Sequence, residues 1–110
     1  MKMAKCEKRY FVETVEAESW DGKDGAPNVS MSSDLQPTVE DARMVIQRRI
    51  ATIAMSSDNH LEWIGWKTTS VEVRFWYTGN SEGLKVHQTK VMSIMEIDEN
   101  GKTSYAHVGD

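Results

Sequence analysis

The pattern of apolar and polar positions predicts one amphipathic helix between Pro37 and Met55. Apolar residues recur there at the spacing of a single helical face, and two more widen that face. The face consists of Val39, Ala42, Ile46, Ile50 and Ile53, widened by Val45 and Ala54. Thr38 comes just before it, and its hydroxyl can accept a hydrogen bond from an unpaired backbone N–H of the first turn. We therefore expect the helix to begin at Thr38 and to pack on a sheet.

Outside the helix, the alternation of apolar and polar residues predicts β-strands. The expected strands cover residues 8–20, 61–67, 71–77, 84–97 and 103–108. Residues 71–77 alternate most clearly. Their inward set is Val71, Val73, Phe75 and Tyr77, and their outward set is Glu72, Arg74 and Trp76.

Two of these strands carry irregularities. Residues 61–67 should place Leu61 with Trp63 on one face and Ile64 with Trp66 on the other. At least one tryptophan should then belong to the core. Gly65 marks either a bulge or a close approach of backbone. In residues 84–97 the apolar residues change from even to odd positions, and a β-bulge between Gln88 and Lys90 would return them to one face.

Turn and loop signals connect these elements. Residues 78–83 contain two glycines and an asparagine, which predicts a hairpin between the strands on either side. Residues 98–101 predict a tight turn. Residues 21–36 are rich in Gly, Ser, Asp and Asn and should form a long loop, and residues 1–7 should be a loose N-terminus.

The expected fold is α+β. A single domain over residues 1–110 has the order β-α-β-β-β-β, with one helix packed on a mostly antiparallel sheet in two layers. A hydrophobic share of 39% and a charged share of 27% suit an ordinary globular domain. Cys6 is the only cysteine, so we expect a reducing cytoplasm. We predict no membrane association, because no apolar run reaches the roughly 18 residues of a spanning helix.

Charge is distributed unevenly along the chain. The formal net charge of −4 argues against direct nucleic-acid binding. Within residues 13–41, acidic residues outnumber the single lysine, Lys23. The acidic residues are Glu13, Glu16, Glu18, Asp21, Asp24, Asp34, Glu40 and Asp41. Such a block can steer a basic partner toward the protein, and the alternative is a solvated segment kept soluble by its charge.

The sequence contains no motif that indicates catalysis. The histidines are separated along the chain and lack the ligand spacing of a metal site, apart from Asp58 near His60. Cys6 has no identifiable base beside it. No glycine-rich phosphate loop, nucleophile elbow or zinc-protease motif occurs. We therefore predict that the protein is not an enzyme and has no catalytic, cofactor or metal site.

Trp76 is the leading candidate for a partner-binding residue. It lies on the polar face of residues 71–77 with Glu72 and Arg74. A tryptophan in that position is covered by a neighbouring element, stacked under Arg74 or Lys85, or available to a partner. The predicted interaction surface combines these residues with the acidic side chains of Glu13, Glu16, Glu18, Asp21 and Asp24.

The leading hypothesis is a non-enzymatic module that binds another protein with a basic surface. Size and charge suggest by analogy a small acidic inhibitor, encoded by a phage or mobile element, that acts against a bacterial defence protein or a nucleic-acid-binding protein. A second hypothesis is a small-molecule binder or minor enzyme, with its ligand between the helix and Trp63 or Trp66. A third is a subunit that functions only as an oligomer, such as a homodimer joined through the edge strand 103–108.

Overall fold

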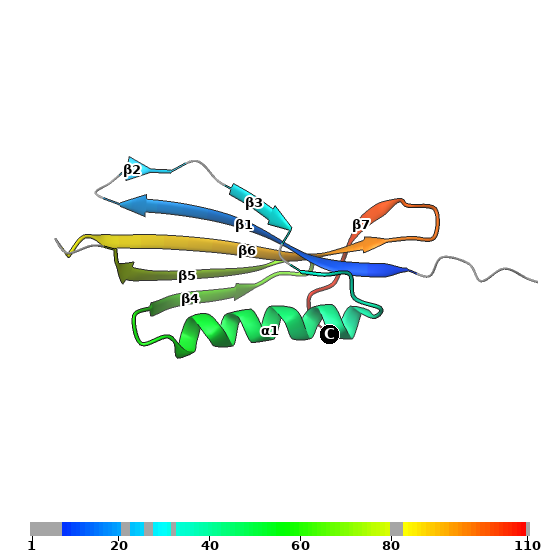
Figure 1. Ribbon diagram of the computed structural model, residues 1–110, viewed down its shortest axis with the longest axis horizontal. Helices are drawn as coiled ribbons and strands as arrows, with labels where there is room; N and C mark the ends of the chain where they lie inside the picture. Colours follow the sequence, from blue (N-terminus) through cyan, green and yellow to red (C-terminus); the bar gives the residue numbers. More distant parts are fainter. Residues whose placement is uncertain (1–7, 21–22, 26–27, 32, 80–82, 110) are drawn as a thin grey trace, which may run out of the picture.

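The computed structural model describes residues 8–20, 23–25, 28–31, 33–79 and 83–109. One helix packs on a twisted antiparallel sheet (Figure 1). The elements are β1 (Arg9–Trp20), β2 (Lys23–Asp24), β3 (Asn28–Met31), α1 (Val39–Met55), β4 (His60–Trp66), β5 (Val71–Thr78), β6 (Lys85–Ile97) and β7 (Thr103–Ala106). The predicted α+β class and the order β-α-β-β-β-β are confirmed, with β2 and β3 as additional short strands.

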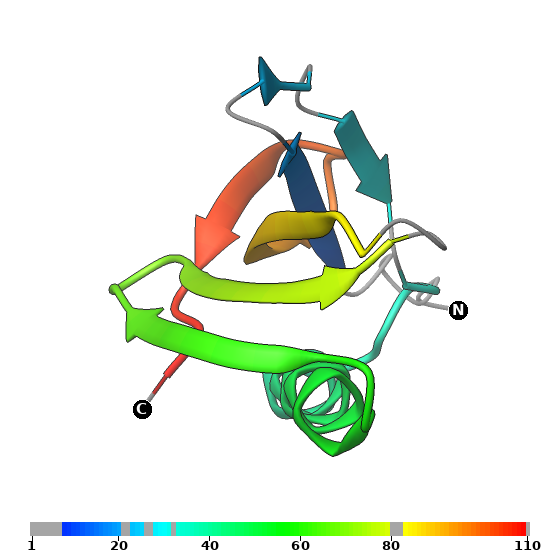
Figure 2. The ribbon, with the colours of Figure 1, turned by 90° about the vertical axis from the view of Figure 1, so that its left-hand side faces the viewer.

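The long strands β1 and β6 form the centre of the sheet. They pair without interruption from Arg9 opposite Ile97 to Trp20 opposite Val86. On its other side, the first part of β6 pairs with β5 and its last part pairs with β7. β4 pairs with β5 and completes the order β2-β1-β6-β5-β4. Seen end-on, the sheet curves strongly and α1 lies along one side of it (Figure 2). We call the face that carries α1 the helix face and the opposite face the outer face.

The prediction of a loop over residues 21–36 is wrong where β2 and β3 form. Both strands pair with β1, and beyond them Gln36 exchanges two backbone hydrogen bonds with Tyr10, of 2.9 and 2.6 Å. Ser33 accepts a hydrogen bond from the backbone N–H of Val12 at 2.7 Å. The returning chain therefore pairs with an edge of β1 whose backbone groups would otherwise lack partners. Residues 1–7, predicted to be loose, lie outside the described part of the chain.

The helix begins and packs as its sequence predicts. The backbone N–H of Asp41 donates to Thr38 Oγ1 at 3.1 Å, which confirms Thr38 as the N-cap. Ala42, Ile46 and Ile53 are buried on the helix face. They belong to one core with Val12, Val71, Val73, Phe75, Met92, Ile94 and Val108. Ala54 is exposed, so the apolar stripe is narrower than predicted.

The turn predictions also hold. β5 and β6 form the expected hairpin, closed by a hydrogen bond from Gly79 N–H to Leu84 O at 2.9 Å. Asp98 begins the tight turn into β7, where its Oδ1 accepts from the N–H groups of Asn100 and Lys102, both at 2.8 Å. Gly101 has φ of 81°, a conformation that glycine adopts without steric cost.

The predicted bulge in β6 is wrong. Both neighbours pair with this strand in unbroken register. Its apolar residues therefore occupy both faces: Met92 and Ile94 are buried beneath α1, while Val91 and Met95 are half-buried on the outer face. Phe11 lies opposite Met95 and Val15 lies opposite Val91, so the cross-strand neighbours shield one another there.

A bulge is present in β4 instead. Leu61 lies opposite Phe75, yet Trp63 lies opposite Arg74, so the extra residue is Glu62. Leu61 and Trp63 consequently lie on opposite faces, contrary to prediction. Neither tryptophan of β4 enters the core, since Trp63 is 46% exposed and Trp66 is 51% exposed. β4 is the last strand of the sheet, which leaves its side chains with fewer neighbours than those of β5.

Candidate functional site

The outer face of β4 and β5 carries Trp63, Gly65, Glu72 and Arg74 side by side. The guanidinium carbon of Arg74 lies 4.7 Å from the centroid of the Trp63 ring, and Arg74 Nε lies 2.6 Å from Glu72 Oε2. The Trp63 ring lies over Gly65, where a Cβ atom would come within 2.3 Å of it. Of the two alternatives predicted at Gly65, the bulge lies elsewhere in β4, and the group that approaches the Gly65 backbone is the Trp63 ring. A larger residue there would displace the tryptophan.

Trp76 is stacked between its neighbours on the same face. Its ring is parallel to that of His60, with centroids 3.9 Å apart, and Lys85 Nζ lies 4.4 Å from its centroid. The predicted stacking under Lys85 is present, whereas Arg74 stacks on Trp63. Trp76 is half-buried as a result. The sequence favours Trp76 as the partner-binding residue, but Trp63 and Trp66 are more exposed than Trp76.

The edge of the sheet at β4 is unusually apolar. Leu61 is 40% exposed, Trp63 46%, Ile64 36% and Trp66 51%. The register places Trp63 on the outer face and the other three on the helix face. Within residues 8–20, 23–25, 28–31, 33–79 and 83–109, β4 pairs with β5 alone. One edge therefore combines exposed apolar side chains on both faces with backbone groups that face no other strand.

The predicted acidic surface does not assemble in one place. Glu13 lies on the outer face, where its Oε1 accepts from the Tyr105 hydroxyl at 3.4 Å. Glu16 and Glu18 lie on the helix face and have partners there: Lys90 Nζ is 3.3 Å from Glu16 Oε1. Asp21 and the side chain of Asp24 fall outside the described part of the chain. Of the predicted surface, the structure brings together only Glu72, Arg74 and Trp76.

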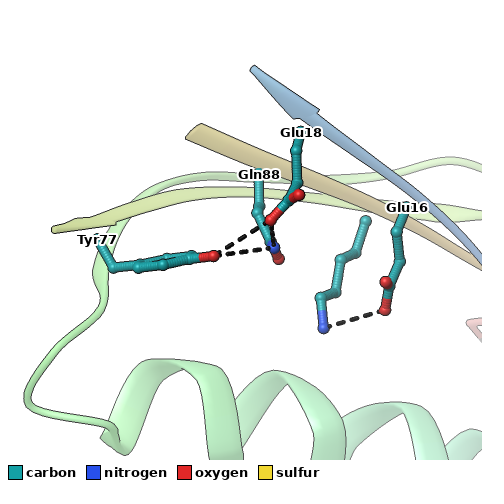
Figure 3. A network of polar contacts seen from close by, with 5 residues as sticks. Glu16, Glu18, Tyr77 and Gln88 are labelled. Atoms are coloured by element: carbon teal, nitrogen blue, oxygen red, sulfur yellow. Dashed lines mark hydrogen bonds and ion pairs between the residues drawn. The ribbon is translucent and has the colours of Figure 1, made fainter. Parts of the chain in front are cut away.

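Glu18 is the centre of a polar network between the sheet and α1 (Figure 3). The Tyr77 hydroxyl donates to Glu18 Oε1 at 3.2 Å, and Gln88 Nε2 donates to the same oxygen at 2.7 Å. Burial raises the pKa of Tyr77 above its usual 10.0, and the hydrogen bond to Glu18 and its charge raise that pKa further. The three residues come from β1, β5 and β6, and no spacing in the sequence predicts their meeting.

A cavity of about 170 Å³ lies beneath α1, near the Glu16–Lys90 pair. Its lining residues are Thr14, Arg49, Thr52, Ile53, Lys90 and Met92. Neither Trp63 nor Trp66 lines it, so this cavity is not the position between α1 and these tryptophans that the sequence predicts for a small-molecule ligand. The alternation of β1 places Thr14 on the helix face. Its position opposite Met92 depends on pairing with a strand far along the chain.

Comparison with known proteins adds no functional assignment. No family model matches this chain, and neither a curated protein nor a solved structure matches it. Among the residues that the structure describes, no three His, Cys, Asp or Glu side chains gather where they could hold a metal ion. In the same part of the chain, α1 is neither long nor apolar enough to cross a membrane.

Proposed function

We propose that this chain is a non-enzymatic protein-binding module that takes an extended segment of its partner onto the edge of β4 that pairs with no strand of the described chain. The observation that carries the proposal is the exposure of Leu61, Trp63, Ile64 and Trp66 along one edge strand. Unpaired N–H and C=O groups on an edge strand are a template for another strand. In recognition by strand addition, backbone hydrogen bonds supply affinity and alternate side chains supply specificity.

The residues around this edge have the chemistry of an interaction surface. Tryptophan and arginine are enriched among the residues that dominate binding energy at protein interfaces. Trp63 and Arg74 are already stacked on one another, so less side-chain freedom is lost when a partner covers them. Glu72 holds Arg74 from the other side. A flat aromatic surface with a fixed cation is thereby available next to the strand edge.

The proposed surface differs in charge from the surface predicted by the sequence. Glu62, Lys67 and Arg74 give the β4 region both signs of charge, and the acidic residues of β1 lie elsewhere. We therefore do not extend the proposal to a basic partner. Inhibition of a bacterial defence protein and a cytoplasmic location stay predictions, based on size, charge and cysteine content alone.

The test is a binding measurement with matched aromatic variants at the two edges of the sheet. A protein captured from a bacterial lysate by the wild-type chain is purified, and its Kd is measured with each variant. Trp66→Ala at β4 should weaken binding by about 2 kcal/mol or more, close to thirtyfold in Kd. Tyr105→Ala on β7 removes a side chain of similar exposure, 54% against 51%, and should leave Kd unchanged.

A second variant tests strand addition itself. Ile64→Lys places a charge on the edge strand, which is how natural proteins prevent pairing there, and it should abolish capture while the domain stays folded. Loss of binding in Tyr105→Ala instead would transfer the interface to β7, the edge predicted for an oligomer. If the purified chain associates with itself and Ile64→Lys abolishes this association, the strand added to β4 comes from another copy of the chain.

A further inference from the structure

The cavity beneath α1 has two cationic side chains, Arg49 and Lys90, beside an apolar wall. Arg49, Thr52 and Ile53 contribute to it from the second half of α1, Thr14 contributes from β1, and Lys90 and Met92 contribute from β6. Met92 is 1% exposed, Thr14 2% and Ile53 7%, so the inner wall consists of firmly packed residues. The cavity is thus bounded by the helix and the two central strands of the sheet.

The two cations differ in how they are compensated. Lys90 Nζ lies 3.3 Å from Glu16 Oε1 and 5.9 Å from the centroid of the Phe75 ring. Arg49 is half-buried, and in the described part of the chain its side chain makes neither a hydrogen bond nor an ion pair. A partly desolvated guanidinium without a counter-ion is unfavourable, and an anion bound beside it would relieve that cost. Arg49 and Lys90 together outweigh Glu16 by one positive charge.

We propose that this cavity binds a small organic carboxylate with a short apolar body. The planar guanidinium of Arg49 matches the geometry of a carboxylate, and the body would lie against Ile53 and Met92. A volume of about 170 Å³ suits such a ligand, since an apolar cavity of roughly 150 Å³ holds benzene. A phosphate fits less well, because a dianion would be repelled by Glu16 and would leave the apolar wall unfilled.

The proposal is tested by an NMR titration of the intact chain with benzoate, followed by the methyl signals of Ile53 and Met92. We expect saturable shifts of both signals. The neutral analogue benzamide has nearly the same shape, and we expect it to bind at least about tenfold more weakly, because it cannot form the ion pair with Arg49.

Adjacent arginines on the helix provide a matched control. Arg49→Gln should weaken benzoate binding about tenfold, and Arg49→Lys should weaken it less because the charge remains. Arg48 is exposed and does not line the cavity, and Arg48→Gln should change the dissociation constant less than about twofold. Trp66→Ala should also bind benzoate normally, so this result is separable from binding at the β4 edge.

Three results would overturn the proposal. The first is the absence of saturable shifts at Ile53 and Met92 with benzoate. The second is equal binding of benzoate and benzamide, which would show that the cavity does not select a negative charge. The third is an equal effect of Arg48→Gln and Arg49→Gln, which would reduce the role of Arg49 to the general charge of the helix.

Discussion

Both faces of β5 carry aromatic residues, and the surroundings of these residues differ between the faces. On the helix face, Tyr77 donates its hydroxyl to Glu18, and Phe75 is 4% exposed. On the outer face, Trp76 stacks on His60 and under Lys85, and Arg74 stacks on Trp63. Where a helix covers the sheet, polar groups need partners within the protein. Where nothing in the described chain covers it, aromatic rings are shielded by cations and partly exposed to solvent.

The two proposed binding sites use different parts of the molecule. Side chains of the helix face enclose a cavity and pair with one another, which suits a small ligand held inside the domain. Side chains of the β4 edge are exposed on both faces of one strand, which suits a macromolecular partner. Substitutions that affect one role should therefore leave the other intact.

The largest effect is expected from truncation of aromatic residues on the two faces. Phe75→Ala should lower the free energy of unfolding by about 3–5 kcal/mol, because it leaves a cavity in the core. Trp63→Ala should cost roughly 1 kcal/mol or less, because the ring is 46% exposed. Denaturant unfolding of both variants measures the difference. Equal losses would show that the outer face of β4 is covered as thoroughly as the core.

An intermediate effect is expected from the Glu18 network. Tyr77→Phe removes the hydrogen bond to Glu18 and the longer one, of 3.5 Å, that Gln88 Nε2 donates to the hydroxyl, and it should cost about 1 kcal/mol at neutral pH. Because the folded pKa of Tyr77 is raised above 10.0, the folded state retains its proton where the unfolded chain loses it. This contribution is complete below pH 10 and is lost as pH rises through the folded pKa.

The loss should be visible as a fall in stability with increasing pH above about 10. Tyr77→Phe should make that fall shallower. Tyr10→Phe should also do so, since burial and the neighbouring Glu96 raise the pKa of Tyr10. Unfolding followed at several alkaline pH values checks both variants. An unchanged slope in Tyr77→Phe would show that the Glu18 network does not hold the tyrosine proton.

The smallest effect is expected at the ion pair of the outer face. Arg74→Gln removes the contact with Glu72 and the stacking on Trp63, and it should cost about 0.2–1 kcal/mol because the guanidinium is largely exposed. Added salt should diminish the difference from the wild-type chain. A decrease of several kcal/mol in the free energy of unfolding would show that this surface stabilises the fold, which contradicts its assignment as a partner-binding surface.

The contrast between β5 and β4 shows where sequence reasoning succeeds. Val71, Val73 and Phe75 are buried as their alternation predicts, because β5 has a strand on each side and α1 across one face. The alternation of β4 predicts the wrong faces for its side chains, because a bulge at Glu62 reverses the face of the residues that follow it. A bulge depends on the partner strand, and the sequence of β4 alone carries no signal for its position.

The candidate sites were less predictable than the fold. Aromatic composition indicated an interaction surface, and Glu72, Arg74 and Trp76 do lie together. The acidic residues of β1 are close in the sequence, yet the alternation of the strand places Glu13 on the face opposite Glu16 and Glu18. The sequence does not predict the residues that line the cavity, because Thr14, Arg49 and Lys90 meet only through the packing of α1 on β1 and β6.

Features that depend on residues close together in the chain can be predicted from the amino-acid sequence. The N-cap at Thr38 and the turn at Asp98 result from interactions within a few residues, and the apolar period of α1 is a local pattern that marks the face buried against the sheet. Three features are visible only in the folded chain: Glu18 meets Tyr77 and Gln88, β2 and β3 pair with β1, and β4 lies at the end of the strand order. These outcomes depend on strand register and order, which arise from pairing between distant segments and leave no local period in the chain.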